Sequence, residues 1–97
     1  MKKHIFDKYV TVVAERMGLN EADIFDRQVA DSVKARHWLY LLCFQRNMGI
    51  MEIQKYMAQS GFAVYHSNII YSNKTVLKSL KKDPDLKQIF NELKHAI

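Results

Sequence analysis

The sequence has few of the residues that break helices or build tight turns. Its 97 residues include one proline, three glycines and one cysteine. All-β domains join many short strands through turns rich in glycine and proline, so this composition argues against them. Hydrophobic residues make up 48% of the chain, which excludes a disordered protein. We therefore expect residues 1–97 to form a single all-α domain.

The low cysteine content and the lack of a long apolar run bear on location. A single cysteine, Cys43, excludes an internal disulfide and is typical of a reducing compartment. The start, "MKKHIFDKYVTVVAERMG", resembles a signal peptide, but Asp7, Lys8 and Glu15 interrupt its apolar run. No stretch approaches the roughly 20 apolar residues of a membrane span. We expect a soluble, cytoplasmic protein with no membrane contact.

The usual signatures of catalysis are also missing. The four histidines are isolated, with no histidine or carboxylate partner at the spacing of a metal site. Cys43 lies in the apolar run "YLLCF" without a basic neighbour, which favours core packing over nucleophilic catalysis. There is no glycine-rich phosphate loop. We expect no enzymatic activity, no metal, no cofactor and no small-molecule substrate.

Apolar residues at helical spacing are plentiful from the first residues onward. The pattern from Ile5 to Met17 predicts a helix, and Gly18 is a suitable residue just past its end. Asn20 can cap the short segment "EADIF", with Asp23 as its capping-box partner. The residues "DRQVAD" then indicate a loop.

A long segment in the middle of the chain is apolar on most of its circumference. This segment, "VKARHWLYLLCFQRN", covers residues 33–47. Such density predicts the central and most buried helix. Asp31 or Ser32 can cap its start, and Gly49 can end it.

Three further helices are expected, which makes about six in all. The first is "IMEIQKYMA", the second runs from about His66 to Leu80, and Asp83 followed by Pro84 marks the start of the third. The expected inward-facing residues of these helices are Ile50, Ile53, Met57, Ile69, Ile70, Val76, Leu80, Leu86, Ile89, Phe90, Leu93 and Ile97. Across the whole chain we expect Trp38, Leu41, Leu42, Ile53, Ile69 and Leu93 to be buried together.

The stretch "YHSNIIYSNKTVLKSLKKDP" has the pattern of a DNA-recognition helix. A short helix, a turn and a second helix that opens with small polar residues is the order of a helix-turn-helix, in which the second helix enters the major groove. Ser and Asn suit base edges. Lys74, Lys78, Lys81 and Lys82 share one face and could contact phosphates, in keeping with a formal charge of +5. The alternative is an ordinary solvated face, which suits Lys81 and Lys82 near a helix C-terminus.

The segment "HSNIIYSNKTV" resembles the signature of the C-terminal DNA-binding domain of the bacterial chromosomal replication initiator, DnaA. In that family a D-H-[TS]-T-V-[LI] motif opens the recognition helix. "VKARHWLYLL" is similar to the family's V-x-A-R-Q-x-x-x-Y-L helix, and "GIMEIQKYM" resembles its S-L-x-E-I-G-x-x-F helix. "VVAERMGLNEADIF" and "KTVLKSLKKDPDLKQIFNEL" fit the remaining helices, so the resemblance covers nearly the whole chain.

The resemblance implies a set of contacts to double-stranded DNA. His66 matches the base-contacting His, Ser67 and Asn68 match the residues after it, and Lys74 matches a basic position. Arg36 matches an Arg that grips phosphate. The full set of candidate contacts is Arg27, Arg36, His37, Tyr65, His66, Ser67, Asn68, Tyr71, Lys74 and Lys78. The implied role is helix-turn-helix DNA binding in DNA replication or transcription control, with another replication or phage protein as a further candidate partner.

The sequence departs from the family pattern at several of these positions. Tyr65 replaces the acidic residue before the signature, Val64 replaces an Arg, and His37 replaces a Gln. The turn is longer, and only Arg27 remains of a basic loop that reaches the minor groove in the family. A second hypothesis is therefore a protein-interaction adaptor on the same fold. Joint exposure of Phe62, Val64 and Tyr65 would favour it, whereas packing of Phe62 and Tyr65 over the core would not.

Overall fold

The computed structural model describes residues 2–97 and confirms an all-α domain. Within these residues there are six helices and no strand. The helices are α1 (Lys3–Met17), α2 (Glu21–Ile24), α3 (Ser32–Gln45), α4 (Ile50–Gln59), α5 (His66–Lys82) and α6 (Pro84–Lys94). None of them is long and apolar enough to cross a membrane.

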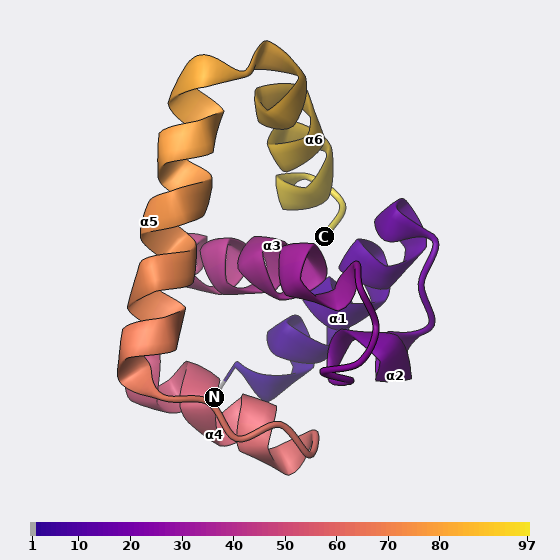
Figure 1. The fold of residues 1–97 in the computed structure, drawn as a ribbon, viewed down its shortest axis with the longest axis vertical. Coiled ribbons are helices and arrows are strands. Elements are labelled where there is room, and N and C mark those ends of the chain that lie inside the picture. The colour runs from indigo at the N-terminus through magenta and orange to yellow at the C-terminus, as the bar shows by residue number, and fades with distance from the viewer. Residues whose placement is uncertain (1) are drawn as a thin grey trace.

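Helix α3 lies at the centre of the fold, as its apolar circumference predicts. It contacts α1 and α2 on one side and α5 and α6 on the other (Figure 1). The long helix α5 runs along one edge of the molecule. Helix α4 packs at the start of α5, and α6 folds back from its far end.

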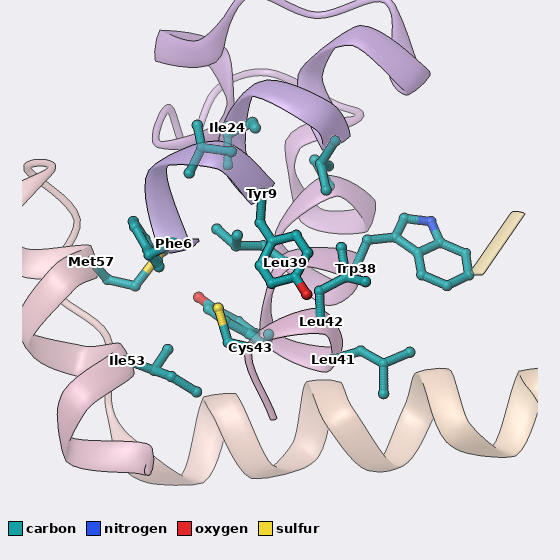
Figure 2. Packing of buried hydrophobic residues seen from close by; sticks show 14 of the residues in the cluster. Phe6, Tyr9, Ile24, Trp38, Leu39, Leu41, Leu42, Cys43, Ile53 and Met57 are labelled. Carbon is teal, nitrogen blue, oxygen red and sulfur yellow. The ribbon is translucent and has the colours of Figure 1, made fainter. Parts of the chain in front are cut away.

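The core is built mainly from α3 and the inner faces of its neighbours. All six residues expected to be buried together are buried: Trp38, Leu41, Leu42, Ile53, Ile69 and Leu93. Phe6 and Tyr9 of α1 and Ile24 of α2 complete the cluster on the other side of α3 (Figure 2). Cys43 is also buried within it, and this burial raises the pKa of its thiol. A thiol held protonated in this way is a core side chain rather than a nucleophile.

Two apolar residues expected in the core lie at the surface instead. Ile70 has 38% of its surface exposed, and Ile97 has 40%. Helix α5 lies at the edge of the fold and buries one face only, and successive residues on a helix point about 100° apart, so Ile69 occupies the core while Ile70 turns toward solvent. Ile97 follows the end of α6, where only Leu93 is fully buried.

Three of the expected helix ends are confirmed. Gly18 takes the left-handed conformation at the end of α1, with φ 67°. The backbone N–H of Asn20 donates to Asp23 Oδ2 over 3.0 Å at the start of α2, as in a capping box. The Asp83 side chain accepts a hydrogen bond from the Asp85 N–H at the start of α6.

Helix α3 begins where expected, with Asp31 at the N-cap position, but the capping bond is absent and the helix ends before the expected residue. Asp31 makes no side-chain cap, and Ser32 is buried with its hydroxyl donating to the Asp26 and Val29 carbonyls of the preceding loop. Gly49 does not end the helix. The left-handed residue is Asn47, with φ 62°, a conformation that Asn tolerates better than most residues. Gly49 instead precedes α4 with an extended backbone.

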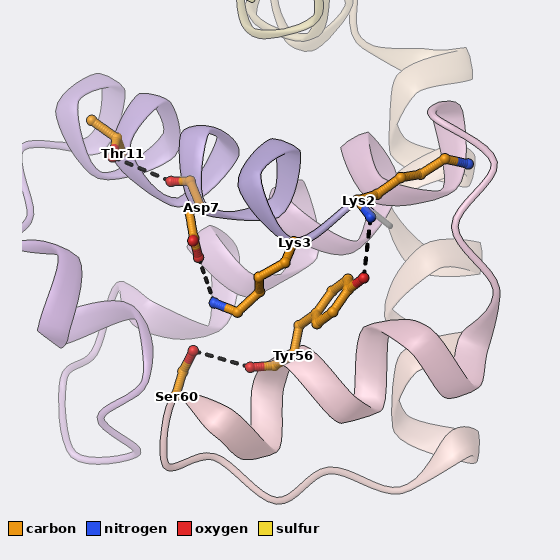
Figure 3. A network of polar contacts seen from close by, with 6 residues as sticks. All are labelled: Lys2, Lys3, Asp7, Thr11, Tyr56 and Ser60. Atoms are coloured by element: carbon orange, nitrogen blue, oxygen red, sulfur yellow. Dashed lines mark hydrogen bonds and ion pairs between the residues drawn. The ribbon is translucent and has the colours of Figure 1, made fainter.

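The N-terminal residues tie α1 to α4 (Figure 3). The Lys2 backbone N–H donates to the Tyr56 hydroxyl over 3.3 Å, and that hydroxyl donates to Glu52 Oε2 over 2.6 Å. This bond lowers the pKa of Glu52 and raises the pKa of Tyr56. The Lys3 ammonium pairs with Asp7 and lies 5.9 Å from the Tyr56 ring centroid. These contacts join the start of α1 to α4.

Candidate nucleic-acid interface

The turn between α4 and α5, residues 60–65, is held from two sides. Gln54 of α4 donates through Nε2 to the Val64 carbonyl over 2.7 Å. Arg27, from the loop before α3, donates through Nη2 to the Ala63 carbonyl over 2.6 Å. A turn of this length would otherwise be mobile. Both bonds fix the path by which the chain enters α5.

Phe62 anchors the same turn to the interior of the domain. Its side chain is buried, and two guanidinium groups lie over its ring. The Cζ atom of Arg27 is 3.8 Å from the ring centroid, and that of Arg36 is 4.4 Å away. Such cation–π contacts gain strength where water is excluded. The turn, the loop before α3 and α3 itself therefore meet at Phe62.

Arg36 is an internal residue, which the sequence pattern did not indicate. Only 8% of it is exposed, and its Nη1 donates to the Ile24 carbonyl over 2.7 Å and to Ser32 Oγ over 3.0 Å. These bonds close the end of α2 against the start of α3. Burial lowers the pKa of Arg36, and the nearby Arg27 charge acts in the same direction. A phosphate contact by the rest of the guanidinium stays a prediction.

Replacement of Arg36 tests this internal role. We expect Arg36→Ala to lower the free energy of unfolding by about 1–3 kcal/mol, because it leaves buried hydrogen-bond acceptors unpaired and uncovers Phe62. Arg36→Lys should recover little of this, since an ammonium cannot reproduce the planar stacking. Urea denaturation measures both variants. Unchanged stability in Arg36→Ala would contradict the internal role.

Asn68 lies with Arg36 and its neighbours around a small cavity of about 160 Å³. Arg27, His37 and Tyr40 also line it. His37 is half-buried, and this burial lowers its pKa, with the Arg36 charge as a second cause. His37 is therefore neutral at pH 7 and adds no charge to the site. Burial raises the pKa of Tyr40 to about 12, so this hydroxyl stays protonated.

The first turn of α5 presents free polar side chains. His66, Ser67 and Asn68 are exposed, and Tyr65 before them has 78% of its surface exposed. Within residues 2–97 no side chain caps this helix; the Tyr65 carbonyl accepts the Asn68 N–H over 3.1 Å. Tyr65, His66 and Ser67 line a shallow hollow together with Gln54. Their side chains are thus not used to close the helix.

A row of lysines continues along the outer face of α5. Lys74, Lys78 and Lys82 line a second shallow hollow, next to Tyr71, which has 70% of its surface exposed. In the part of the chain that the structure describes, the only ion pairs are Lys3–Asp7 and Arg16–Glu92. The charges of this row are therefore not neutralised. Lys81, expected on the same face, does not line the hollow.

The hydrophobic residues of the turn do not form one exposed patch. Phe62 is buried, Val64 is half-buried and Tyr65 is exposed. The expectation that Phe62 packs over the core is confirmed, and the same expectation for Tyr65 is wrong. The joint exposure that would have favoured an adaptor surface at the turn is not found.

Gln54 is a site residue that the sequence reasoning missed. It holds the turn and borders the hollow of the first α5 turn. Its sequence signal is a polar residue one helical turn after Ile50, on the inward side of α4 between Ile50 and Met57. A polar side chain at such a position needs a hydrogen-bond partner, which indicates a nearby backbone segment.

Comparison of the chain with protein-family models, with curated proteins and with solved structures found no match. In residues 2–97 no three His, Cys, Asp or Glu side chains gather closely enough to hold a metal ion. The function therefore has to be inferred from the exposed face of α5 and the groups around it.

Proposed function

We propose that this chain binds double-stranded DNA through a helix-turn-helix formed by α4 and α5, with α5 in the major groove. The observation that carries the proposal is the first turn of α5. Consecutive polar side chains, His66, Ser67 and Asn68, are exposed there and make no capping bond. In a helix-turn-helix this is the turn whose side chains meet base edges.

The chemistry of these side chains suits sequence-specific reading. Asn can donate to and accept from the N7 and N6 edge of adenine at once, and Ser can donate or accept. The turn before them is fixed by Gln54 and Arg27, so the side chains are presented without a large loss of chain entropy on binding. The resemblance to the initiator C-terminal domain supports the same assignment and points to replication initiation or transcription control.

The lysine row supplies phosphate contacts in this proposal. Lys74, Lys78 and Lys82 recur every four residues, so they follow the axis of α5 away from the polar turn. Lysines placed in this way contact the backbone beside the groove and set the register without reading sequence. Arg27 is engaged with Ala63 and Phe62, so minor-groove reading from its loop is not part of the proposal.

Salt dependence tests the phosphate contacts. With three to four phosphates neutralised, log affinity for duplex DNA should fall with log salt at a slope of about −3 to −4. Lys78→Ala should flatten that slope by roughly one unit and weaken all sequences about equally. Lys87→Ala, an exposed lysine on α6, is the matched control. Fluorescence anisotropy at several salt concentrations measures each slope, and a slope near zero would contradict DNA binding.

Selection from random duplexes tests whether sequence is read. We expect an enriched motif with the intact chain and loss of that motif with the double variant His66→Ala and Asn68→Ala. The lysine row should still hold DNA in this variant at low salt. DNA binding without an enriched sequence motif would show that the chain binds DNA non-specifically. No binding at low salt would favour the adaptor hypothesis.

A further inference from the structure

A mostly apolar groove of about 500 Å³ lies where α3, α5 and α6 meet. Its apolar lining includes Val33 and Trp38 of α3, Val76 of α5 and Leu86 of α6. Its volume lies in the range of binding clefts, roughly 300–1,000 Å³. In Figure 1, α6 folds back beside the upper part of α5, and α3 lies below α6 and reaches α5.

The floor and the rim of this groove differ in character. Trp38 is 9% exposed, while Val33 beside it is 48% exposed and leaves apolar surface open to water. Apolar surface of this kind, bordered by polar groups, marks interaction sites. The DNA-binding proposal makes no use of these apolar residues.

A basic surface adjoins the groove along α5. Thr75 and Ser79 line both this groove and the hollow of Lys78 and Lys82, so the two depressions share a wall. Lys34 of α3 lines the groove itself. No Asp or Glu of residues 2–97 lines either depression. An apolar floor is thus flanked by positive charge without a neutralising acid.

We propose that this groove binds an acidic amphipathic helix of a partner protein. Apolar side chains at positions i, i+3 or i+4, and i+7 of that helix fill the groove over Trp38. Carboxylates beside them meet Lys34, Lys78 and Lys82. The complementary charges steer the encounter and set the orientation, while the apolar contacts supply most of the affinity.

The charge and the apolar lining of the groove favour an acidic amphipathic helix over two other occupants, a second copy of the chain and duplex DNA. A second copy of the chain would bring a further formal charge of +5 to a surface that is already positive. Duplex DNA offers charge for the lysines but no apolar ridge for Val33, Val76 and Leu86. The groove lies away from the first turn of α5, so this proposal does not depend on sequence-specific DNA binding.

The test starts from a displayed library of random 16-residue peptides selected on the purified full chain. We expect enriched peptides with apolar residues at helical spacing and Asp or Glu between them. An enriched peptide, synthesised and added to the chain, should shift the fluorescence of Trp38. Because Trp38 is the chain's one tryptophan, the emission comes from a residue that lines this groove, and circular dichroism checks that the fold is unchanged.

Two pairs of variants locate the binding. Val33→Asp should lower the affinity for the peptide by about tenfold or more. Lys34→Glu should lower this affinity mainly at low salt. Ile97→Asp and Lys87→Glu, at exposed positions that do not line the groove, should leave binding unchanged. Val33 and Lys34 are exposed, so their variants should fold, and circular dichroism checks this.

The proposal is overturned by any of three results. Selection could enrich no acidic amphipathic pattern. The enriched peptide could bind Val33→Asp and Ile97→Asp equally well, which would place it elsewhere. Duplex DNA could shift the Trp38 emission as the peptide does and lose this effect in Val33→Asp, which would place nucleic acid in the groove; displacement of the peptide by DNA is expected, because both proposals use Lys78 and Lys82.

Discussion

Leu42→Ala is expected to lower the free energy of unfolding by about 2–5 kcal/mol. Leu42 is fully buried on α3, the helix that contacts α1, α2, α5 and α6. Truncation to Ala removes apolar surface from the core and leaves a cavity, because close-packed neighbours collapse only in part. A loss of this size is a large fraction of the stability of a small domain, roughly 5–15 kcal/mol.

Urea denaturation followed by circular dichroism measures this loss. Leu77→Ala on α5 is the matched control, since Leu77 has 40% of its surface exposed. It should change stability by about 0.5 kcal/mol or less. An effect of Leu42→Ala as small as that of the control would contradict the buried position of this face of α3.

The helices and most of the core could be predicted from the sequence, because buried apolar residues recur in it at helical spacing. A segment such as residues 33–47, apolar on most sides, has to lie at the centre of a domain this small. Periodicity fixes which residues share a face, but it does not resolve two adjacent apolar residues. Ile69 and Ile70 show this, since only the packing of α5 on α3 decided which of them is buried.

The absent side-chain cap at the start of α3 and the residue at its end were missed for a different reason. Ser32 is a suitable capping residue by type, but its hydroxyl is used by loop carbonyls and by Arg36. Those partners come together only after the loop has folded over the helix. The preference of Ser for a capping position is overridden here by these tertiary hydrogen bonds. Gly49 and Asn47 were confused because either residue tolerates a turn.

The exposure of the candidate residues was predicted well where side chains project from α5 and poorly where they turn inward, as at Arg36. The exposure of His66, Ser67 and Asn68 agrees with a polar opening of an amphipathic helix. Arg36 has the same sequence signature as a surface arginine, and yet it packs on Phe62, which is distant in the chain. No local pattern reveals a partner of this kind, because the contact depends on the path of the turn.

Asn68→Ala should reduce specific DNA binding by roughly 5- to 150-fold, the equivalent of a base contact of about 1–3 kcal/mol. Affinity for random DNA should change little, because the lysine row dominates there. Folding stability should also hold, since the Asn68 side chain makes no cap at the start of α5. A capping Asn would instead lose about 1 kcal/mol of stability on replacement.

Thermal melting and competition binding on the same protein separate these outcomes. Asn91→Ala is the matched control, because Asn91 is also exposed on a helix but lies on α6, away from the polar turn. It should leave melting, specific binding and non-specific binding unchanged. A lower melting temperature for Asn68→Ala together with an unchanged ratio of specific to non-specific affinity would make Asn68 a structural residue. A lower ratio at constant melting temperature would place Asn68 at a base edge, as the exposed first turn of α5 leads us to expect.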